Sequence, residues 1–187
     1  MTRLSKPLKA FFGANAIFVL AEVLIAPLYA LYAEDVGATL LIVSYLAATV
    51  FVSKTISLLI ISKFGNSTFT AEQLLHLGFI LRGIGWGLLI FFPIIPVLFI
   101  TQILTGVGQA TGSPGFLALY AKYVDEENGV QISAGWSLTE GFVAAVGTII
   151  GGHIVMQFGF TALFILMTVL SFLASFTFWH YSTNQDS

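Results

Sequence analysis

The sequence contains no cysteine and few charged residues. Without cysteine, neither a disulfide nor a thiolate metal site can form. Charged residues make up 9% of the 187 residues, and hydrophobic residues make up 57%. A typical soluble domain is about 25% charged and about 45–50% apolar. The composition therefore excludes an ordinary soluble domain and predicts an all-α polytopic membrane protein.

Motifs of enzymes and of nucleotide-driven pumps are also missing from the sequence. It has no Walker loop, no HExxH pair, no nucleophile elbow and no Cys/His metal pattern. It has no block of basic residues, and its net charge is −2, so nothing in it favours nucleic-acid binding. We therefore expect a protein that is not an enzyme, with no catalytic residue, no cofactor, no metal and no nucleic-acid partner.

Six stretches are long and apolar enough to cross a membrane as helices, which takes about 20 residues each. They cover residues 10–32, 40–61, 74–92, 97–120, 131–158 and 161–179. The segments AEDVGA, SKFGNSTFTAEQ and KYVDEENG separate them, as do the pair Pro93 and Pro96 and the tight turn QFGF. The sequence thus predicts one domain, residues 1–187, of six transmembrane helices in contact with membrane lipid.

The Lys and Arg residues outside these stretches fall on one predicted side of the membrane. With the N-terminus inside, the cytoplasmic segments hold Arg3, Lys6, Lys9, Lys63 and Lys122, whereas the three outer loops hold no Lys or Arg. Cytoplasmic loops of membrane proteins carry such an excess of basic residues. We expect both termini to be cytoplasmic, with the protein in the inner (plasma) membrane of a prokaryote.

Five ionisable residues lie inside the predicted helices: Glu22, Lys54, Arg82, Glu140 and His153. A charge at mid-membrane costs about 2.5–3.5 kcal/mol on insertion scales, unless it meets a partner or a wet cavity. The pattern is typical of a solute pathway. A second interpretation fits it as well, in which the charges form salt bridges that only hold the helices together.

The first predicted helix carries its polar residues on one face. Asn15, Glu22 and Tyr29 recur every seven residues, which is about two helical turns. Pro27 predicts a kink just beyond Glu22. Desolvation raises the proton affinity of a carboxylate, so an acid in a cavity can load and release a proton.

Other helices supply further candidates. Arg82 cannot deprotonate and needs an acid or an anionic solute, whereas Lys54 is close enough to the cytoplasmic end to snorkel outward. On the fourth helix, Gln102, Thr105 and Gln109 form a polar stripe that can bind a solute or, alternatively, form interhelical hydrogen bonds. His153 fits an interfacial site. The predicted pathway residues are Asn15, Glu22, Tyr29, Lys54, Arg82, Gln102, Thr105, Gln109, Ser137 and Glu140.

Glycine and tryptophan add weaker signals. Gly108 with Gly112, and Gly147 with Gly151, form GxxxG pairs that let helices approach closely, which is common in ordinary membrane-helix packing. Trp136 and Trp179 fit an interfacial belt. Trp86 is predicted to lie deeper, where it can line a cavity.

The order of these features resembles one half of a major facilitator superfamily transporter. FITQILTGVGQATG resembles the family's glycine-rich fourth helix, with Gln102 where an Arg is usual. IISKFGN resembles the loop after the second helix, with Lys63 and Gly65 in place and Ser62 replacing the usual Asp. GTIIGGHI resembles the antiporter motif, with Thr148 at the Pro position, and FGFTALF also matches the family.

The resemblance implies six helices arranged as two inverted three-helix repeats, with the first and fourth helices at a cavity. It implies secondary transport of a small solute by alternating access, with proton coupling through buried acids. Family members have two six-helix halves and this sequence supplies one, so we expect a homodimer that rebuilds twelve helices. Two alternatives remain beside it. One is a non-transporting scaffold or regulatory subunit, and the other is a truncated or heteromeric half of a larger transporter.

Overall fold

The structure is a computed structural model that describes residues 6–124 and 126–183. Within these ranges every regular element is helical. The elements are α1 (Lys6–Val23), η1 (Ala26–Leu28), α2 (Tyr29–Asp35), α3 (Leu40–Thr68), α4 (Ala71–Phe91), α5 (Ile95–Tyr123), η2 (Glu126–Asn128) and α6 (Gly129–Thr183). Of the basic residues used above to orient the chain, Arg3 and the side chain of Lys6 lie outside the described residues.

The first helical stretch is broken shortly after Glu22. The α-helix α1 ends at Val23, and the 3-10 turn η1 follows with a proline in its first two positions. The chain then continues as α2 to Asp35. Pro27 has no backbone N–H to donate and its ring clashes with the preceding turn, so the helix cannot run straight through it. The predicted kink near Pro27 is therefore present.

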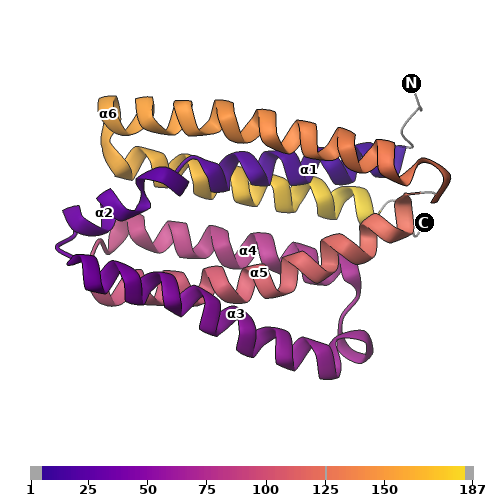
Figure 1. Ribbon diagram of the computed structural model, residues 1–187, viewed down its shortest axis with the longest axis horizontal. Helices are drawn as coiled ribbons and strands as arrows, with labels where there is room; N and C mark the ends of the chain where they lie inside the picture. The colour runs from indigo at the N-terminus through magenta and orange to yellow at the C-terminus, as the bar shows by residue number, and fades with distance from the viewer. Residues whose placement is uncertain (1–5, 125, 184–187) are drawn as a thin grey trace.

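The last helix, α6, is bent back on itself at Gly159. This residue has φ 77° and ψ 176°, which is not helical. Along α1, Phe12 stacks on Trp136 and the backbone of Leu24 lies against Gly151, so residues 129–158 run in the same direction as α1. Residues 160–183 run the opposite way. We call these two segments the first and second arms of α6; Figure 1 shows them as the orange and yellow parts of that helix.

The opposite direction of the second arm is visible in its aromatic contacts with the first helical stretch. Phe160 and Phe164 pack on Tyr32, with ring centroids 5.0 and 4.7 Å away, whereas Phe178 lies 6.5 Å from Phe11. The arm therefore returns along the whole length that α1 and α2 cover.

Five helical stretches among the described residues are long and apolar enough to cross a membrane. They are Leu8–Asp35, Leu40–Lys63, Ala71–Phe91, Ile95–Tyr123 and Gly129–Tyr181. The sequence predicted six, because stretches 131–158 and 161–179 were counted separately. Both lie in α6, where a single residue, Gly159, makes the turn and leaves no loop between them.

Helix boundaries differ from the expected ones where side chains cap the backbone. Helix α4 begins at Ala71 and not at residue 74, because Thr70 and Gln73 form a capping box. The Thr70 hydroxyl accepts from the backbone N–H of Gln73 at 3.2 Å, and the Gln73 side chain accepts from the Thr70 N–H at 3.0 Å. A capping box satisfies two N–H groups that the first turn would leave unpaired.

The helices form a bundle in which α4 packs on α5 and on α6, α1 packs on α6, and α3 packs on α5. Several of these contacts are made at glycine. A Cβ on Gly78 would lie 2.8 Å from the carbonyl oxygen of Gly108, and Gly147 lies against Leu20 and Val23 of α1. Hydroxyls add to this, since Ser171 donates to the Phe79 carbonyl oxygen at 2.7 Å.

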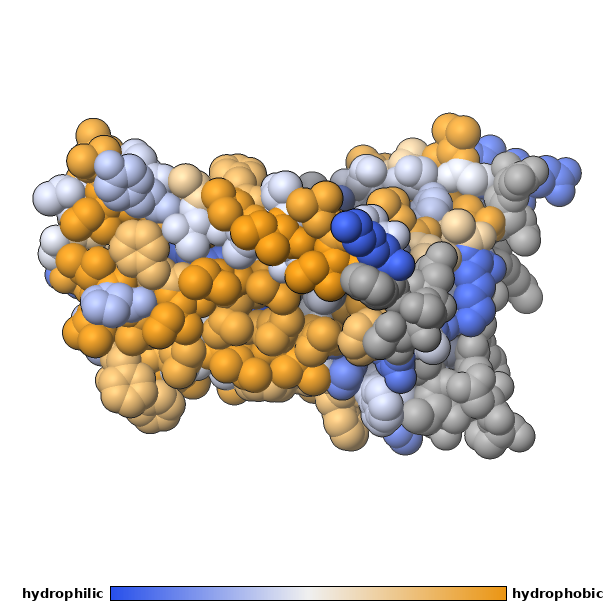
Figure 2. Space-filling model, turned by 90° about the horizontal axis from the view of Figure 1, so that it is seen from below, coloured by the Kyte–Doolittle hydropathy of each residue, from blue (hydrophilic) through white to orange (hydrophobic). Residues whose placement is uncertain are grey.

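The outer surface is apolar over most of its length. Figure 2, which views the molecule from the α3 side, shows a broad hydrophobic band with hydrophilic residues gathered toward the right end. Figure 1 places the start of α1 and the end of α6 at that same end. At this end Lys122 of α5 also forms an ion pair with Glu72 of α4 at 2.9 Å. The distribution is that of a membrane-spanning bundle. We call the end with this ion pair the charged end; two exposed acids, Glu34 and Asp35, end α2 elsewhere.

Candidate functional site

A cavity of about 360 Å³ lies between α1, α4, α5 and the first arm of α6. Each of these helices contributes several side chains or backbone positions to the wall. The lining residues are Asn15, Phe18, Val19, Glu22, Leu75, Phe79, Arg82, Gly112, Ser113, Phe116, Leu117, Trp136 and Glu140. Because charged groups sit among apolar ones at membrane depth, this cavity is the candidate functional site.

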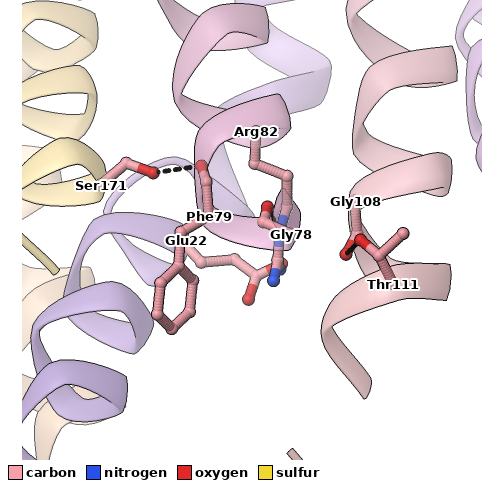
Figure 3. Close-up of polar contacts among 7 residues, drawn as sticks. All are labelled: Glu22, Gly78, Phe79, Arg82, Gly108, Thr111 and Ser171. Atoms are coloured by element: carbon pink, nitrogen blue, oxygen red, sulfur yellow. Dashed lines mark hydrogen bonds and ion pairs between the residues drawn. The ribbon is translucent and has the colours of Figure 1, made fainter. Parts of the chain in front are cut away.

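An ion pair joins α1 to α4 at the cavity wall. Nη1 of Arg82 lies 2.9 Å from Oε1 of Glu22, and Nε of Arg82 donates to the carbonyl oxygen of Gly78 at 3.3 Å. Figure 3 shows the Arg82 side chain extending from α4 with its guanidinium beside the Glu22 carboxylate. The pair thus connects two helices that are separated by 60 residues of sequence.

Glycine and an aromatic ring provide the space that Arg82 occupies. A Cβ on Gly108 would lie 2.9 Å from Cγ of Arg82, and one on Gly112 would lie 3.3 Å from its Nη2. On another side, Cζ of Arg82 lies 3.9 Å from the centre of the Phe18 ring, which is a cation–π contact. The GxxxG pair on α5 therefore accommodates the arginine in addition to letting α4 approach.

The two members of the ion pair differ in how they face the cavity. The Arg82 side chain is 9% exposed, whereas that of Glu22 is 40% exposed. Glu140 is also exposed, and it forms no ion pair with any residue that the structure describes. Among the charged side chains that line the cavity in the described part of the chain, the two carboxylates are therefore more accessible than Arg82.

Aromatic rings form much of the remaining wall. Phe18 stacks on Phe79 with ring centroids 4.6 Å apart, and Trp136 lies 5.6 Å from Phe116. Trp136 also stacks on Phe12 at 4.8 Å, which fixes its orientation. These rings come from all four helices around the cavity.

Four of the ten residues predicted for a solute pathway line this cavity: Asn15, Glu22, Arg82 and Glu140. The other six do not: Tyr29, Lys54, Gln102, Thr105, Gln109 and Ser137. Asn15 is buried, and its Nδ2 donates to the carbonyl oxygen of Phe11 at 2.8 Å. Ser137 is exposed, one position after Trp136 on the first arm of α6.

The helix break explains the place of Tyr29. A seven-residue repeat keeps side chains on one face only while the helix is continuous. Because α1 ends at Val23, Tyr29 starts a new helix and packs half-buried against the core, with its hydroxyl buried and unpaired among the described groups.

The other predicted residues lie on the α3 and α5 side of the bundle. On α5, Gln102 is buried, and Thr105 and Gln109 are half-buried. The residues of α5 that line the cavity begin one turn later and include Gly112, Ser113 and Phe116. Lys54 is half-buried on α3, beside the close approach of that helix to Gly106.

The structure places Trp136, Trp86 and His153 in three different surroundings. Trp136, which was expected in an interfacial belt, lines the cavity, whereas Trp86 is buried in the core against Phe18, at 5.8 Å between ring centroids. His153 is exposed, with Nδ1 3.0 Å from the carbonyl oxygen of Ile149. The spacing of Trp136 four residues before Glu140 was the available signal for its position.

Sequence reasoning also missed the aromatic wall and the ion pair at the charged end. Phe18 lies four residues before Glu22, so helical spacing could have placed both on one face. No comparable signal exists for Lys122 with Glu72, because the two residues are 50 positions apart. In the part of the chain that the structure describes, no group of three or more His, Asp or Glu side chains is positioned to hold a metal ion.

Comparison with known proteins supplies the family. A search of the curated proteins finds no match. The family model of the Major Facilitator Superfamily matches residues 11–186, which includes every helix around the cavity. Together with the all-helical, membrane-spanning bundle, this match shows that the chain belongs to the major facilitator superfamily, a family of secondary transporters and not of enzymes.

Proposed function

We propose that this chain carries a small solute across the membrane by alternating access, with the cavity between α1, α4, α5 and α6 as the solute site. The observation that carries the proposal is a partly buried ion pair in one cavity at membrane depth, together with an acid that has no ionic partner among the described residues. Ionisable residues are expensive there and generally mark substrate or ion pathways.

The position of the ion pair suggests how binding and helix movement are coupled. Glu22 lies just before the break between α1 and η1, and Arg82 lies on α4. A proton on Glu22 neutralises the carboxylate and removes its attraction to Arg82, which loosens α1 from α4. We propose proton coupling through this step. The helix contacts made at glycine allow the packed helices to rock as rigid bodies.

The proposed topology has six membrane crossings, because the two arms of α6 run in opposite directions and each crosses once. We further propose two inverted three-helix repeats. In such an arrangement α1 corresponds to α5, and α3 and α4 correspond to the two arms of α6. Two interfaces support it: α1 packs on α6, while α5 packs on α3 and α4. Both α1 and α5 also line the cavity.

We propose that the charged end faces the cytoplasm of a prokaryotic cell. Lys9, Lys63 and Lys122 belong to segments at this end, where α1 begins and α6 ends. Basic residues are retained on the cytoplasmic side of an inner membrane.

A homodimer is the proposed working form. Ser133, Ser137 and Glu140 are exposed on the first arm of α6, where lipid would be a poor solvent for them. A second copy across a twofold axis along the membrane normal covers this polar side and rebuilds a twelve-helix transporter. A different half of a larger transporter would cover the same surface in a heteromer.

One observation favours a second candidate, a non-transporting scaffold or regulatory subunit. Glu22 and Arg82 do form a salt bridge, which is what a purely structural role requires. Glu140 distinguishes the two candidates, because it shares the cavity and has no ionic partner among the described residues. A purely structural role gives no reason for an unpaired acid at this depth.

Transport is tested by reconstitution. A solute library is first screened by thermal shift in detergent, and each stabilising solute is then tested by counterflow into proteoliposomes. We expect accumulation with the wild-type protein and at least a tenfold lower rate with Glu22→Gln. Glu34→Gln is the matched control, because Glu34 is exposed on α2 and does not line the cavity. Solutes that bind but never accumulate would contradict transport and favour the scaffold.

A further inference from the structure

We infer that the cavity selects a compact organic cation of ammonium type, held by the carboxylate of Glu140 and the indole ring of Trp136. This inference rests on the proposed function, since it names the substrate class of the same site. The observations behind it are the charge balance of the cavity, the spacing of the two residues on α6, and the size and chemistry of the wall.

The charge balance excludes an anionic solute. Three charged side chains line the cavity, two acids and one arginine. Arg82 is 9% exposed, its Nη1 is paired with Glu22, its Nε donates to Gly78, and the Phe18 ring covers one face of its guanidinium. An anion therefore meets only one positive group in this lining, and that group is nearly buried and already paired with an acid. Since the arginine neutralises one acid, the cavity keeps a net charge of about −1, carried by Glu140.

Trp136 and Glu140 form a recognition pair for an ammonium group. They are four residues apart on the first arm of α6, so they project from the same helix face one turn apart. An ammonium ion is attracted to the face of an aromatic ring, most strongly to that of tryptophan. The carboxylate supplies the opposite charge beside it. Stacking on Phe12 at 4.8 Å holds the indole in place.

The wall favours an organic cation over a metal ion. A hard cation such as Ca²⁺ takes about 6–8 oxygen ligands. The oxygen-bearing side chains around this cavity are only Asn15, Glu22, Ser113 and Glu140, and Glu22 is already occupied by Arg82. Phe79, Phe116 and Trp136 instead suit alkyl groups around a charged nitrogen. The volume of about 360 Å³ limits the solute to a small molecule.

Equilibrium binding in detergent tests this directly and does not depend on transport. The probes are tetramethylammonium, choline and tetraethylammonium. Their binding is measured by calorimetry and by quenching of tryptophan fluorescence. The neutral control is 3,3-dimethyl-1-butanol, which has the shape of choline without its charge, and the anionic control is 3,3-dimethylbutanoate. We expect saturable binding of at least one cation, at least tenfold weaker binding of the neutral compound, and no binding of the anion.

Variants assign the binding to the two residues. Glu140→Gln should weaken cation binding at least tenfold, and Trp136→Leu about fivefold or more, while Glu34→Gln binds as the wild type does. Circular dichroism and thermal melts show whether each variant is folded; Glu140 is exposed, so its substitution should leave the fold intact. Unchanged binding in Glu140→Gln overturns the inference, as does the absence of binding by all three cations.

The same measurements separate this inference from the proposed function. Cation binding that depends on Glu140, with no uptake into proteoliposomes, supports the site and contradicts transport. Counterflow of neutral or anionic solutes with no cation binding supports transport and overturns the cation site.

Discussion

Burial of Arg82 determines the energetics of the cavity wall at the scale of single residues. A guanidinium taken out of water loses several kcal/mol of hydration, which only a counter-ion and hydrogen bonds can offset. Glu22 supplies the counter-ion at 2.9 Å, and the Gly78 carbonyl oxygen and the Phe18 ring supply the rest. Removal of Glu22 alone leaves a buried positive charge with only weak partners. Removal of both Glu22 and Arg82 leaves no buried charge.

A double-mutant cycle on this pair follows from that asymmetry. Glu22→Gln should lower the free energy of unfolding by roughly 1–3 kcal/mol, below the 3–5 of a fully buried pair because Glu22 is 40% exposed. Arg82→Gln in the same protein should recover part of the loss. Thermal unfolding in detergent gives the stability of the wild type, of Glu22→Gln, of Arg82→Gln and of the double variant.

The control for this cycle is Glu34→Gln, a change of the same chemistry at an exposed position outside the cavity. Purely additive effects of the two cavity substitutions would contradict a direct interaction, since residues in contact show coupling energies of about 0.5–3 kcal/mol.

The sequence predicted the charged residues of the site better than their arrangement. Glu22, Arg82 and Glu140 are recognisable because a charge inside an apolar stretch is rare and expensive. Their proximity is a property of how α1, α4 and α6 pack, and single-sequence periodicity carries no information on contacts between helices 60 residues apart. Phe79 and Phe116 were missed for a related reason, since aromatic residues are frequent everywhere in this chain.

At the scale of elements, apolar runs located every described stretch that is long enough to cross a membrane, while local chemistry set the breaks. Pro27 correctly predicted the interruption after α1, because proline acts on its own backbone. The hairpin of α6 was expected as a short turn between separate helices at QFGF. In the structure the chain reverses at Gly159 alone. Whether one residue can reverse the chain depends on its φ and ψ, which the sequence does not specify.

Gly159→Ala tests the importance of this reversal. With φ 77° and ψ 176°, the residue lies in a region of backbone space that is essentially restricted to glycine. We expect a loss of about 1–3 kcal/mol in the free energy of unfolding, although no atom lies within 4 Å of the added Cβ. Chemical denaturation followed by circular dichroism gives the value.

Gly135→Ala is the matched control for Gly159→Ala. Gly135 lies in the first arm of α6, and its Cβ would also meet nothing within 4 Å. Alanine in a regular helix is about 0.5–1 kcal/mol more favourable than glycine, so this variant should be as stable as the wild type or more so. Equal stability of the two alanine variants would show that the backbone at residue 159 relaxes without strain.

At the scale of the whole molecule, burial is unevenly distributed among the helices. Half of the most apolar window of α4 is buried, but only 6% of that of α3. Exposed apolar residues of α3 are compatible with lipid. The exposed side of the first arm of α6 is not, because Ser133, Ser137 and Glu140 share it with the rim of the cavity. A single copy in lipid therefore leaves a polar surface that needs cover.

The proposed homodimer provides that cover and makes the last prediction. A twofold axis presents every cavity charge twice, so four acids face two arginines around one pathway, and cations are favoured over anions. Detergent-corrected light scattering should give twice the 20.2 kDa of one chain. Since the sequence has no cysteine, Ser137→Cys should crosslink to its own copy with a flexible bismaleimide, and Leu173→Cys, exposed on the second arm, should not. A protein that is strictly monomeric and still transports at one copy per liposome would rule out the homodimer, because the polar side of α6 would then have to function against lipid.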